Sequence, residues 1–459
     1  MPTDRTTTLL TGWGRTAPSF AEVVVGSGRD VERLAAIVKD LPPRGGIARG
    51  LGRSYGDPAQ NGGGVVIRLQ DRVQDLVIDD ATATARVPAG ISLDELLNVL
   101  VPRGFFVPVS PGTRQVTVGG AIASDIHGKN HHVDGSFGSH VRRMSLLLTD
   151  GTTAELAPNV RSDLFWATVG GMGLTGIILD ATIGLLRIET SRCAVDTTRA
   201  ADLDTLMALM DEGDRYFRYS VAWVDLLAKG ARLGRGVLHR GDHATTDQLE
   251  PRDAVDPLAY APRRVAAVPS LVPPPGVLNH ASLAAFNEMW YRKSPRRRIA
   301  QILSIPAYFH PLDSIASWNR LYGRRGFLQY QFVVPFGAEA ALRTVVERLA
   351  GAGMPSFLSV LKRFGTANPG PLSFPVPGWT LTLDIPAASR GLPALLHGLD
   401  DVVLEAGGRH YLAKDAHATP AAIRRGYPRL DEWRAVRAAA DPTGVWASDQ
   451  SRRLRLLED

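Results

Sequence analysis

Cysteine is almost absent from this chain of 459 residues, since Cys193 is the only one. A single cysteine excludes an intramolecular disulfide framework and any zinc or iron–sulfur site built from several cysteines. Long apolar runs are missing too, because no stretch approaches the roughly 18 to 20 residues that a membrane-spanning helix requires. Residues 1–15 carry charges and threonines without the apolar centre of a signal peptide. We therefore expect a soluble, cytoplasmic protein.

Charge of one sign is not in large excess either. The net charge is +6, with 21% charged and 44% hydrophobic residues. This composition excludes a disordered, collagenous or coiled-coil chain, and the length predicts two or three domains. Nucleic-acid binding would require basic residues interleaved with aromatics or a helix-turn-helix pattern. The one basic patch is the run 292–298, which we interpret as a solvated surface loop, and we expect no nucleic-acid partner.

The first 190 residues alternate short apolar runs with glycine-rich turns, which predicts an α+β region. We expect a helix over 31–38 behind Asp30. The sequence Ser-Leu-Asp-Glu at 92–95 is typical of a capping box, and it predicts a helix with leucines on one face that ends at Pro102 and Gly104. The runs 76–78 and 82–87 predict a β-hairpin.

The pattern changes after about residue 193. A helix is expected around 203–210, followed by strands at 327–334 and 379–385 that each carry polar side chains on one face. Such strands either form the floor of a polar pocket or belong to an antiparallel sheet with one face in solvent. The proline-rich stretch 262–278 predicts a long loop, acting as a lid or a linker.

Three glycine-rich segments, at 47–57, 111–132 and 165–178, are the main candidates for a ligand site. The first fits neither a dinucleotide-binding fingerprint nor a P-loop. Its backbone amides could cradle a phosphate, or the segment could be an ordinary tight turn. The second has small residues that admit a flat, bulky ligand, followed by three histidines. A metal site is disfavoured because Gly128 opposes the helix that His127 and His131 would need. Together the segments favour an extended, phosphate-bearing cofactor.

These segments resemble the FAD-binding domain of the vanillyl-alcohol oxidase (p-cresol methylhydroxylase) flavoprotein superfamily. With 289–294, 327–332 and 371–379, the resemblance narrows to the family of decaprenylphosphoryl-β-D-ribose 2-oxidases and covers nearly the whole chain. It implies an α+β fold, with a two-subdomain FAD-binding domain and a substrate domain that contains an antiparallel sheet. The expected boundaries are 1–192 for the FAD domain, 193–407 for the substrate domain, and 408–459 for a C-terminal segment that returns to the FAD domain.

The resemblance also implies the residues that contact FAD. These are Ala48, Arg49, Gly50, Leu51, Gly52, Arg53, Ser54, Tyr55, Gly56, Asp57, Pro58, Gly112, Thr117, Val118, Gly119, Gly120, His127, Gly128, Lys129, Asn130, Ile178 and Tyr411. Relatives with covalent flavin often have Gly-His-Ser where this chain has Gly-Arg-Ser at 52–54. We therefore expect FAD to be bound non-covalently.

The activity implied is FAD-dependent oxidation of the ribose C2 hydroxyl of decaprenylphosphoryl-β-D-ribose to a 2-keto intermediate. This is the first half of an epimerisation for cell-wall arabinan synthesis, completed by a short-chain reductase partner. Lys414, Lys129 and Tyr55 match catalytic residues, with Lys414 as base or electrostatic stabiliser. The residues that match the substrate pocket are Gln331, Lys362, Trp223 and Thr382, the last of which replaces a cysteine of mycobacterial members.

Two other functions compete with this one. The first is a related flavin oxidase that acts on a soluble sugar or an aldonolactone. The second is a binding or scaffold protein without catalysis, which the retention of Lys414, Lys129 and His127 opposes. The loop 262–278 and the basic run 292–298 suggest peripheral contact with an anionic membrane. No metal is expected.

Overall fold

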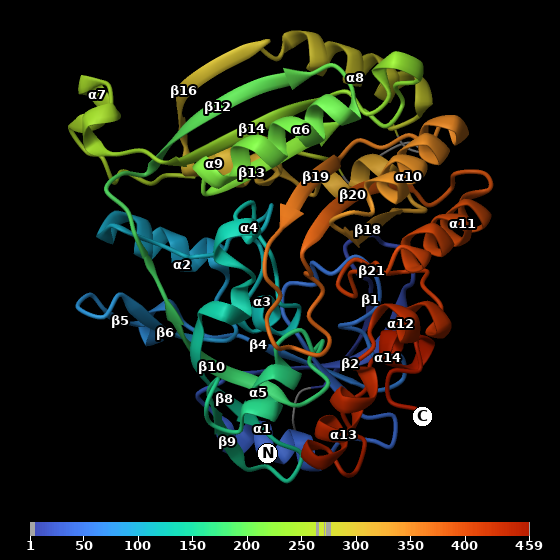
Figure 1. Cartoon of the computed structure of the whole chain (residues 1–459). Helices are drawn as coiled ribbons and strands as arrows, with labels where there is room; N and C mark the ends of the chain where they lie inside the picture. The colour runs from blue at the N-terminus through green and yellow to red at the C-terminus, as the bar shows by residue number, and fades with distance from the viewer. Residues whose placement is uncertain (1–4, 263–265, 270, 272–276, 459) are drawn as a thin grey trace.

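The computed structural model describes residues 5–262, 266–269, 271 and 277–458, which form the expected α+β fold. Figure 1 shows a large sheet with helices against one face, lying above the smaller sheets of the N-terminal half. The C-terminal helices lie beside the N-terminal strands, so the two ends of the chain share one part of the molecule.

The N-terminal half contains two main sheets. The first has the order β1-β2-β4-β3, in which β2, β4 and β3 are parallel, and the second is antiparallel with the order β5-β6-β10-β8-β9. A short pair, β11-β7, adds to them. The strands are β1 Thr6–Leu10, β2 Ser19–Gly26, β3 Gly46–Arg49, β4 Val65–Leu69, β5 Val77–Asp79, β6 Thr84–Pro88, β7 Phe105–Phe106, β8 Val141–Leu147, β9 Thr153–Leu156, β10 Ile177–Gly184 and β11 Leu186–Arg187.

Five helices accompany these sheets, and two of them begin where local capping signals predict. They are α1 Val31–Lys39, α2 Leu93–Leu100, α3 Val118–Ala123, α4 His131–Asp134 and α5 Ser162–Thr168. Asp30 caps α1, and Ser92 with Glu95 makes both hydrogen bonds of a capping box at the start of α2. The four leucines of α2 are completely buried, which confirms the predicted apolar face.

The second half of the chain, from β12 onward, is built on an antiparallel sheet of eight strands, in the order β16-β12-β14-β13-β19-β20-β18-β21. The predicted strands at 327–334 and 379–385 are neighbours in it, with Gln331 opposite Thr382. The strands are β12 Arg192–Ala200, β13 Tyr219–Val224, β14 Gly236–His243, β16 Arg297–Ser304, β18 Phe327–Pro335, β19 Ser359–Phe364, β20 Gly378–Pro386 and β21 Arg409–His410.

One face of this sheet is covered by α6, α10 and α11, which supply most of its apolar core. The opposite face carries the polar side chains of β18 and β20 and looks toward the N-terminal half. The helices of this half are α6 Leu203–Gly213, α7 Pro251–Ala254, α8 His280–Lys293, α9 Ile305–Phe309, α10 Glu339–Ala352 and α11 Leu392–Glu405.

Two segments of this half were expected to be loops. The proposed loop 262–278 includes residues 263–265, 270 and 272–276, which lie outside the described residues; Ala266–Ala267 forms β15, parallel to β17 (Ile315–Ala316). The basic run 292–298 is exposed, but the interpretation as a loop was wrong for most of it. The run ends α8 and begins β16, because β16 pairs with β12 along its length.

The C-terminal segment returns to the N-terminal half, as the resemblance implies. Its helices are α12 Pro420–Gly426, α13 Leu430–Ala440 and α14 Asp449–Arg453. Trp433 Nε1 donates a hydrogen bond to the carbonyl oxygen of Ala167, 3.0 Å away, and Trp446 forms an isolated parallel β-bridge with Gly46, the first residue of β3. These contacts carry the segment around residue 414 back onto the glycine-rich loops.

Candidate active site

A cavity of about 720 Å³ lies between the glycine-rich loops and the polar face of the large sheet. Most residues expected at the cofactor and the substrate line it. They are Ala48, Arg49, Gly50, Leu51, Gly52, Arg53, Ser54, Tyr55, Pro58, Gly112, Thr117, Gly119, Gly120, His127, Gly128, Lys129, Ile178, Trp223, Gln331, Lys362, Thr382, Tyr411 and Lys414. The strands β18 and β20 therefore form part of the wall of a pocket, and the alternative of a solvent-facing sheet was wrong.

Four expected FAD contacts stand behind the wall of this cavity: Gly56, Asp57, Val118 and Asn130. Asp57 forms an ion pair with Arg453 of the C-terminal segment at 2.7 Å. Asn130 donates a hydrogen bond from Nδ2 to the carbonyl oxygen of Pro108 at 2.7 Å, and Val118 is fully buried in the apolar core. These side chains support the loops that line the cavity.

The first glycine-rich loop follows β3 and is held in shape by Arg49. The Arg49 guanidinium donates hydrogen bonds to the carbonyl oxygens of Ala59 (2.8 Å) and Thr11 (2.7 Å). Burial lowers the pKa of Arg49 to about 10. Gly52 has a φ of +65°, and a Cβ there would lie 2.3 Å from the Arg49 guanidinium, so the turn requires glycine. The Tyr55 amide donates to the carbonyl oxygen of Ala413, which joins this loop to the C-terminal segment.

The second loop leads into α3 and then into a buried turn. Asp125 is the centre of this turn, because its carboxylate accepts hydrogen bonds from Ser136, Asn368, Ser373 and the Gly138 amide. Burial raises the pKa of Asp125, while these four bonds oppose the rise. The turn fixes the segment that starts with residue 127.

The loops leave room for an elongated, flat ligand. A Cβ at Gly112 would meet no atom within 4 Å, so the wall is open at that position, and Gly173, with φ +79°, also lines the cavity. Because residues of all three loops line one cavity of about 720 Å³, a single ligand that fills it can contact all three. These features fit a dinucleotide such as FAD.

Three lysines point into the part of the cavity below the large sheet. Burial lowers the pKa of Lys129 and of Lys362 to about 7, and the charges of the other two lysines contribute at Lys362. Burial also lowers the pKa of Lys414, to about 8, against the attraction of Asp384. Among the described residues that line the cavity, none is Asp or Glu. The site therefore offers positive charge to an anionic ligand, from Lys414 and from the protonated forms of Lys129 and Lys362.

His127 connects two of the strands to the second loop. Its Nδ1 lies 2.9 Å from Lys362 Nζ, and its Nε2 lies 2.9 Å from Gln331 Nε2. Burial, followed by the charge of Lys362, holds the pKa of His127 well below its usual value, so the ring is neutral near pH 7. A neutral imidazole accepts a hydrogen bond at only one nitrogen, so its tautomer is linked to the protonation of Lys362.

Lys414 lies against Tyr55, with Nζ 4.1 Å from the centre of the phenol ring. Such a cation–π contact favours the ammonium form. Lys129 has a similar contact, 4.3 Å from the ring of Tyr308, whose carbonyl oxygen also accepts from Nζ. Tyr308 is on α9, where no motif marks it in the sequence.

Asp384 is the acidic residue that sequence reasoning did not assign to the site. It lies on β20 beneath the cavity floor, is completely buried, and accepts hydrogen bonds from Gln329 Nε2 and, at 3.4 Å, from the Tyr322 hydroxyl. Burial raises its pKa to about 7, opposed by these bonds and by Lys414. Its place on the polar face of the strand was the only available signal.

A search of known proteins gives the family of this chain. This chain is 47% identical over 455 residues to the decaprenylphosphoryl-β-D-ribose oxidase of Mycolicibacterium smegmatis, and the match covers 98% of each chain. The chain belongs to the decaprenylphosphoryl-β-D-ribose oxidase family. A family model of an FAD binding domain matches residues 23–157, and a D-arabinono-1,4-lactone oxidase model matches 393–454. The protein is therefore an FAD-dependent oxidoreductase.

Two other relatives match a smaller share of this chain. An uncharacterised protein of Streptomyces coelicolor is 42% identical over 80% of this chain and 100% of its own length. An alditol oxidase from a Streptomyces species is 27% identical over 39% of this chain and 42% of its own. Within the described ranges, no helix of this family member is long and apolar enough to cross a membrane, and no cluster of three or more His, Cys, Asp or Glu could hold a metal ion.

Proposed function

We propose that this protein oxidises the C2 hydroxyl of the ribose in a decaprenylphosphoryl-β-D-ribose to a ketone. The residues that line the cavity would hold FAD non-covalently, and bound FAD would supply the acceptor for the hydride of C2, while the hydroxyl proton would be released to solvent. The observation that carries the proposal is the set of three half-buried lysines in a cavity whose described lining includes no Asp or Glu. A relative named as an oxidase of this lipid, 47% identical over 98% of the chain, gives the substrate class.

Lys129 and Lys362 are the partners we assign to the phosphodiester. Both are half-buried in the cavity wall, so an anion beside their ammonium forms meets a charge that water screens less than at an exposed surface. Gln331, Trp223 and Thr382 line the same part of the cavity, where the ribose would lie. Thr382 supplies no thiol, and the oxidation needs none because FAD accepts the hydride.

Lys414 is the residue we assign to the reacting hydroxyl. The ring of Tyr55 and the carboxylate of Asp384 both favour its ammonium form near pH 7. As an ammonium it orients the hydroxyl and stabilises the negative charge that develops on the oxygen as the hydroxyl loses its proton. The base role is disfavoured because the lysine must first lose its proton.

The assignment of FAD contacts follows the lining of the cavity, with Gly56, Asp57, Val118 and Asn130 as supports. Arg53, at the position of the histidine of covalent relatives, lies over the Trp13 ring at 3.9 Å and supplies no flavin-linking atom. We propose the domain boundaries 1–192, 193–407 and 408–459. We also propose that a partner short-chain reductase consumes the keto product.

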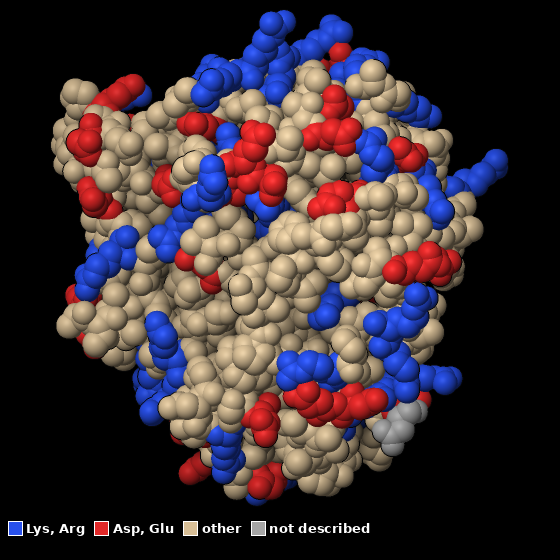
Figure 2. All heavy atoms as spheres, in the orientation of Figure 1, with Lys and Arg blue, Asp and Glu red and all other residues tan. Residues whose placement is uncertain are grey.

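Peripheral contact with an anionic membrane is part of this proposal. Figure 2 shows Lys and Arg gathered along the upper edge, over α8 and β16. Arg296, Arg297 and Arg298 are all exposed, and Ile299 beside them is 59% exposed. Flotation with liposomes should show binding that requires anionic lipid and weakens when the three arginines are neutralised; binding without either dependence would refute this contact.

The main experiment is anaerobic addition of decaprenylphosphoryl-β-D-ribose to the purified holoenzyme, followed by the visible spectrum. We expect the yellow flavin band to bleach in the wild type. Lys414→Ala should retain FAD and lose about a hundredfold to a thousandfold in the rate of bleaching, the scale of one transition-state contact to a developing oxyanion. Wild-type flavin that bleaches with a soluble aldonolactone and not with the lipid would favour the alternative oxidase, which the match over 393–454 supports.

A further inference from the structure

The polar floor of the cavity gives way to an apolar wall along the large sheet. One row of cross-strand neighbours runs from Gln331 on β18 through Thr382 on β20 and Val360 on β19 to Trp223 on β13. All four line the cavity. Because neighbours in such a row stand about 5 Å apart, the character of the surface changes within a short distance of the lysines.

The apolar wall continues from the sheet onto α8. Phe286 and Trp290 are four residues apart, so they share one face of the helix, and their rings stack with centres 6.1 Å apart. Phe286 also contacts Phe357, which precedes β19, with ring centres 5.3 Å apart. All three line the cavity, and Trp290 is 37% exposed, so the wall reaches the surface here.

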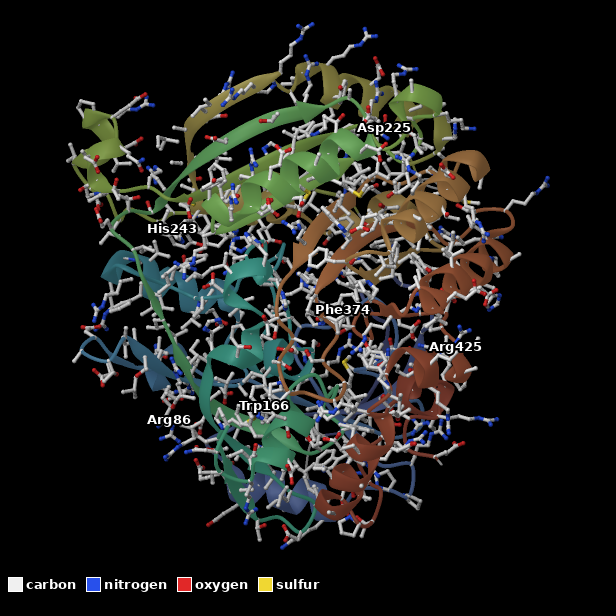
Figure 3. The ribbon with its side chains drawn as sticks, viewed as in Figure 1. Arg86, Trp166, Asp225, His243, Phe374 and Arg425 are labelled. Carbon is white, nitrogen blue, oxygen red and sulfur yellow. The ribbon has the colours of Figure 1, made fainter. Side chains whose placement is uncertain are left out.

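A buried polar cluster fixes α8 in this orientation. Asp225 accepts hydrogen bonds from Asn287 Nδ2 at 2.7 Å and from Arg235 at 2.8 Å, and Arg235 also pairs with Glu288 at 2.6 Å. Figure 3 labels Asp225 at this corner of the large sheet. Because Asn287 and Glu288 lie between Phe286 and Trp290, the cluster sets the direction of both aromatic side chains.

We infer that this wall, from Trp223 and Val360 to Phe286 and Trp290, is the binding site of the polyprenyl chain of the substrate. The inference rests on the proposed function, which places the phosphodiester at Lys129 and Lys362. A chain without polar atoms gains free energy only by leaving water, and half-exposed aromatic side chains give it such a surface. Continuity with the lysines lets one molecule occupy both regions, and the wall directs the chain toward the exposed end of α8.

The test compares two soluble esters of β-D-ribose 1-phosphate, one with farnesol and one with methanol. Anaerobic stopped-flow measurement of flavin reduction in the holoenzyme gives the Kd and the limiting rate for each. We expect wild type to bind the farnesyl ester more tightly, and Phe286→Ala/Trp290→Ala to weaken that binding about tenfold, as expected for losing large aromatic contacts. The methyl ester should be unaffected, as should the limiting rate.

The matched control is Phe20→Ala, which removes an aromatic side chain that is 63% exposed on β2. This variant should change neither the Kd nor the limiting rate for either ester. Equal loss with both esters, or no loss with either, would overturn the inference. If neither ester reduces the flavin of wild type, the proposed function fails by itself. Equilibrium dialysis with farnesyl phosphate then decides the apolar site: weaker binding by the double variant supports it, and equal binding refutes it.

Discussion

The affinity for an anionic substrate should fall as pH rises from 6 to 8. Lys129 and Lys362 have pKa values of about 7 because both are buried, so each is mostly an ammonium at pH 6 and mostly a neutral amine at pH 8. The phosphodiester stays negative throughout. Over these two pH steps the protonated fraction of a group with pKa 7 falls about tenfold. A substrate that requires one ammonium therefore loses about tenfold in affinity, and one that requires both loses about a hundredfold.

Anaerobic stopped-flow flavin reduction measures this directly, since the Kd comes from the dependence of the rate on substrate concentration. The ratio of the limiting rate to Kd reports the groups of the free enzyme. Lys362→Arg is the matched variant, because a guanidinium remains charged across the range. It should remove the part of the pH dependence that Lys362 causes. A Kd that is constant from pH 6 to 8, or that tightens with rising pH, would refute the assignment of the phosphodiester to these lysines.

Three further changes test the loops and the charge balance. Gly52→Ala should weaken FAD binding by at least about fivefold, because a non-glycine residue held at positive φ costs about 1–3 kcal/mol and its Cβ would meet Arg49. Equilibrium dialysis of the flavin measures this. Ser92→Ala removes the cap of α2 and should lower the free energy of unfolding by about 1 kcal/mol in urea titrations. Asp384→Asn removes the attraction that raises the pKa of Lys414, so the alkaline decline of the limiting reduction rate should move to lower pH; an unmoved profile contradicts the link.

Local signals in the sequence predicted the elements whose ends are set within a few residues. The helix α2 is an example, because Ser92 and Glu95 cap each other across three positions and its leucines share one face. The strand β18 is another, since the alternation around Gln331 follows from the period of a strand. These interactions are close in sequence, so pattern alone contains them.

Pattern alone left open which side of that strand is buried. The answer depends on the pairing of β18 with β20 and of β20 with β19, and on the loops that cover them. Lys362 entered the site by resemblance alone, because its partner His127 is 235 residues away in the sequence. Asp384 likewise acquires its raised pKa from burial beneath the cavity. Such properties arise from tertiary packing, which a single sequence does not record.

The half-buried lysines also provide selectivity between substrates. A neutral sugar that filled the cavity would leave Lys129 and Lys362 without an opposite charge. Both lysines would then have to be neutral, or binding would include the free-energy cost of an unpaired ammonium shielded from water. A phosphodiester supplies the missing charge and raises both pKa values toward the ammonium form. Since Asp384 attracts Lys414 and is not a partner of the other two, the third lysine stays charged without the substrate. The cavity therefore divides its positive charge between one lysine that is ready for chemistry and two whose charge depends on binding an anion, and this favours a phosphorylated lipid over an aldonolactone.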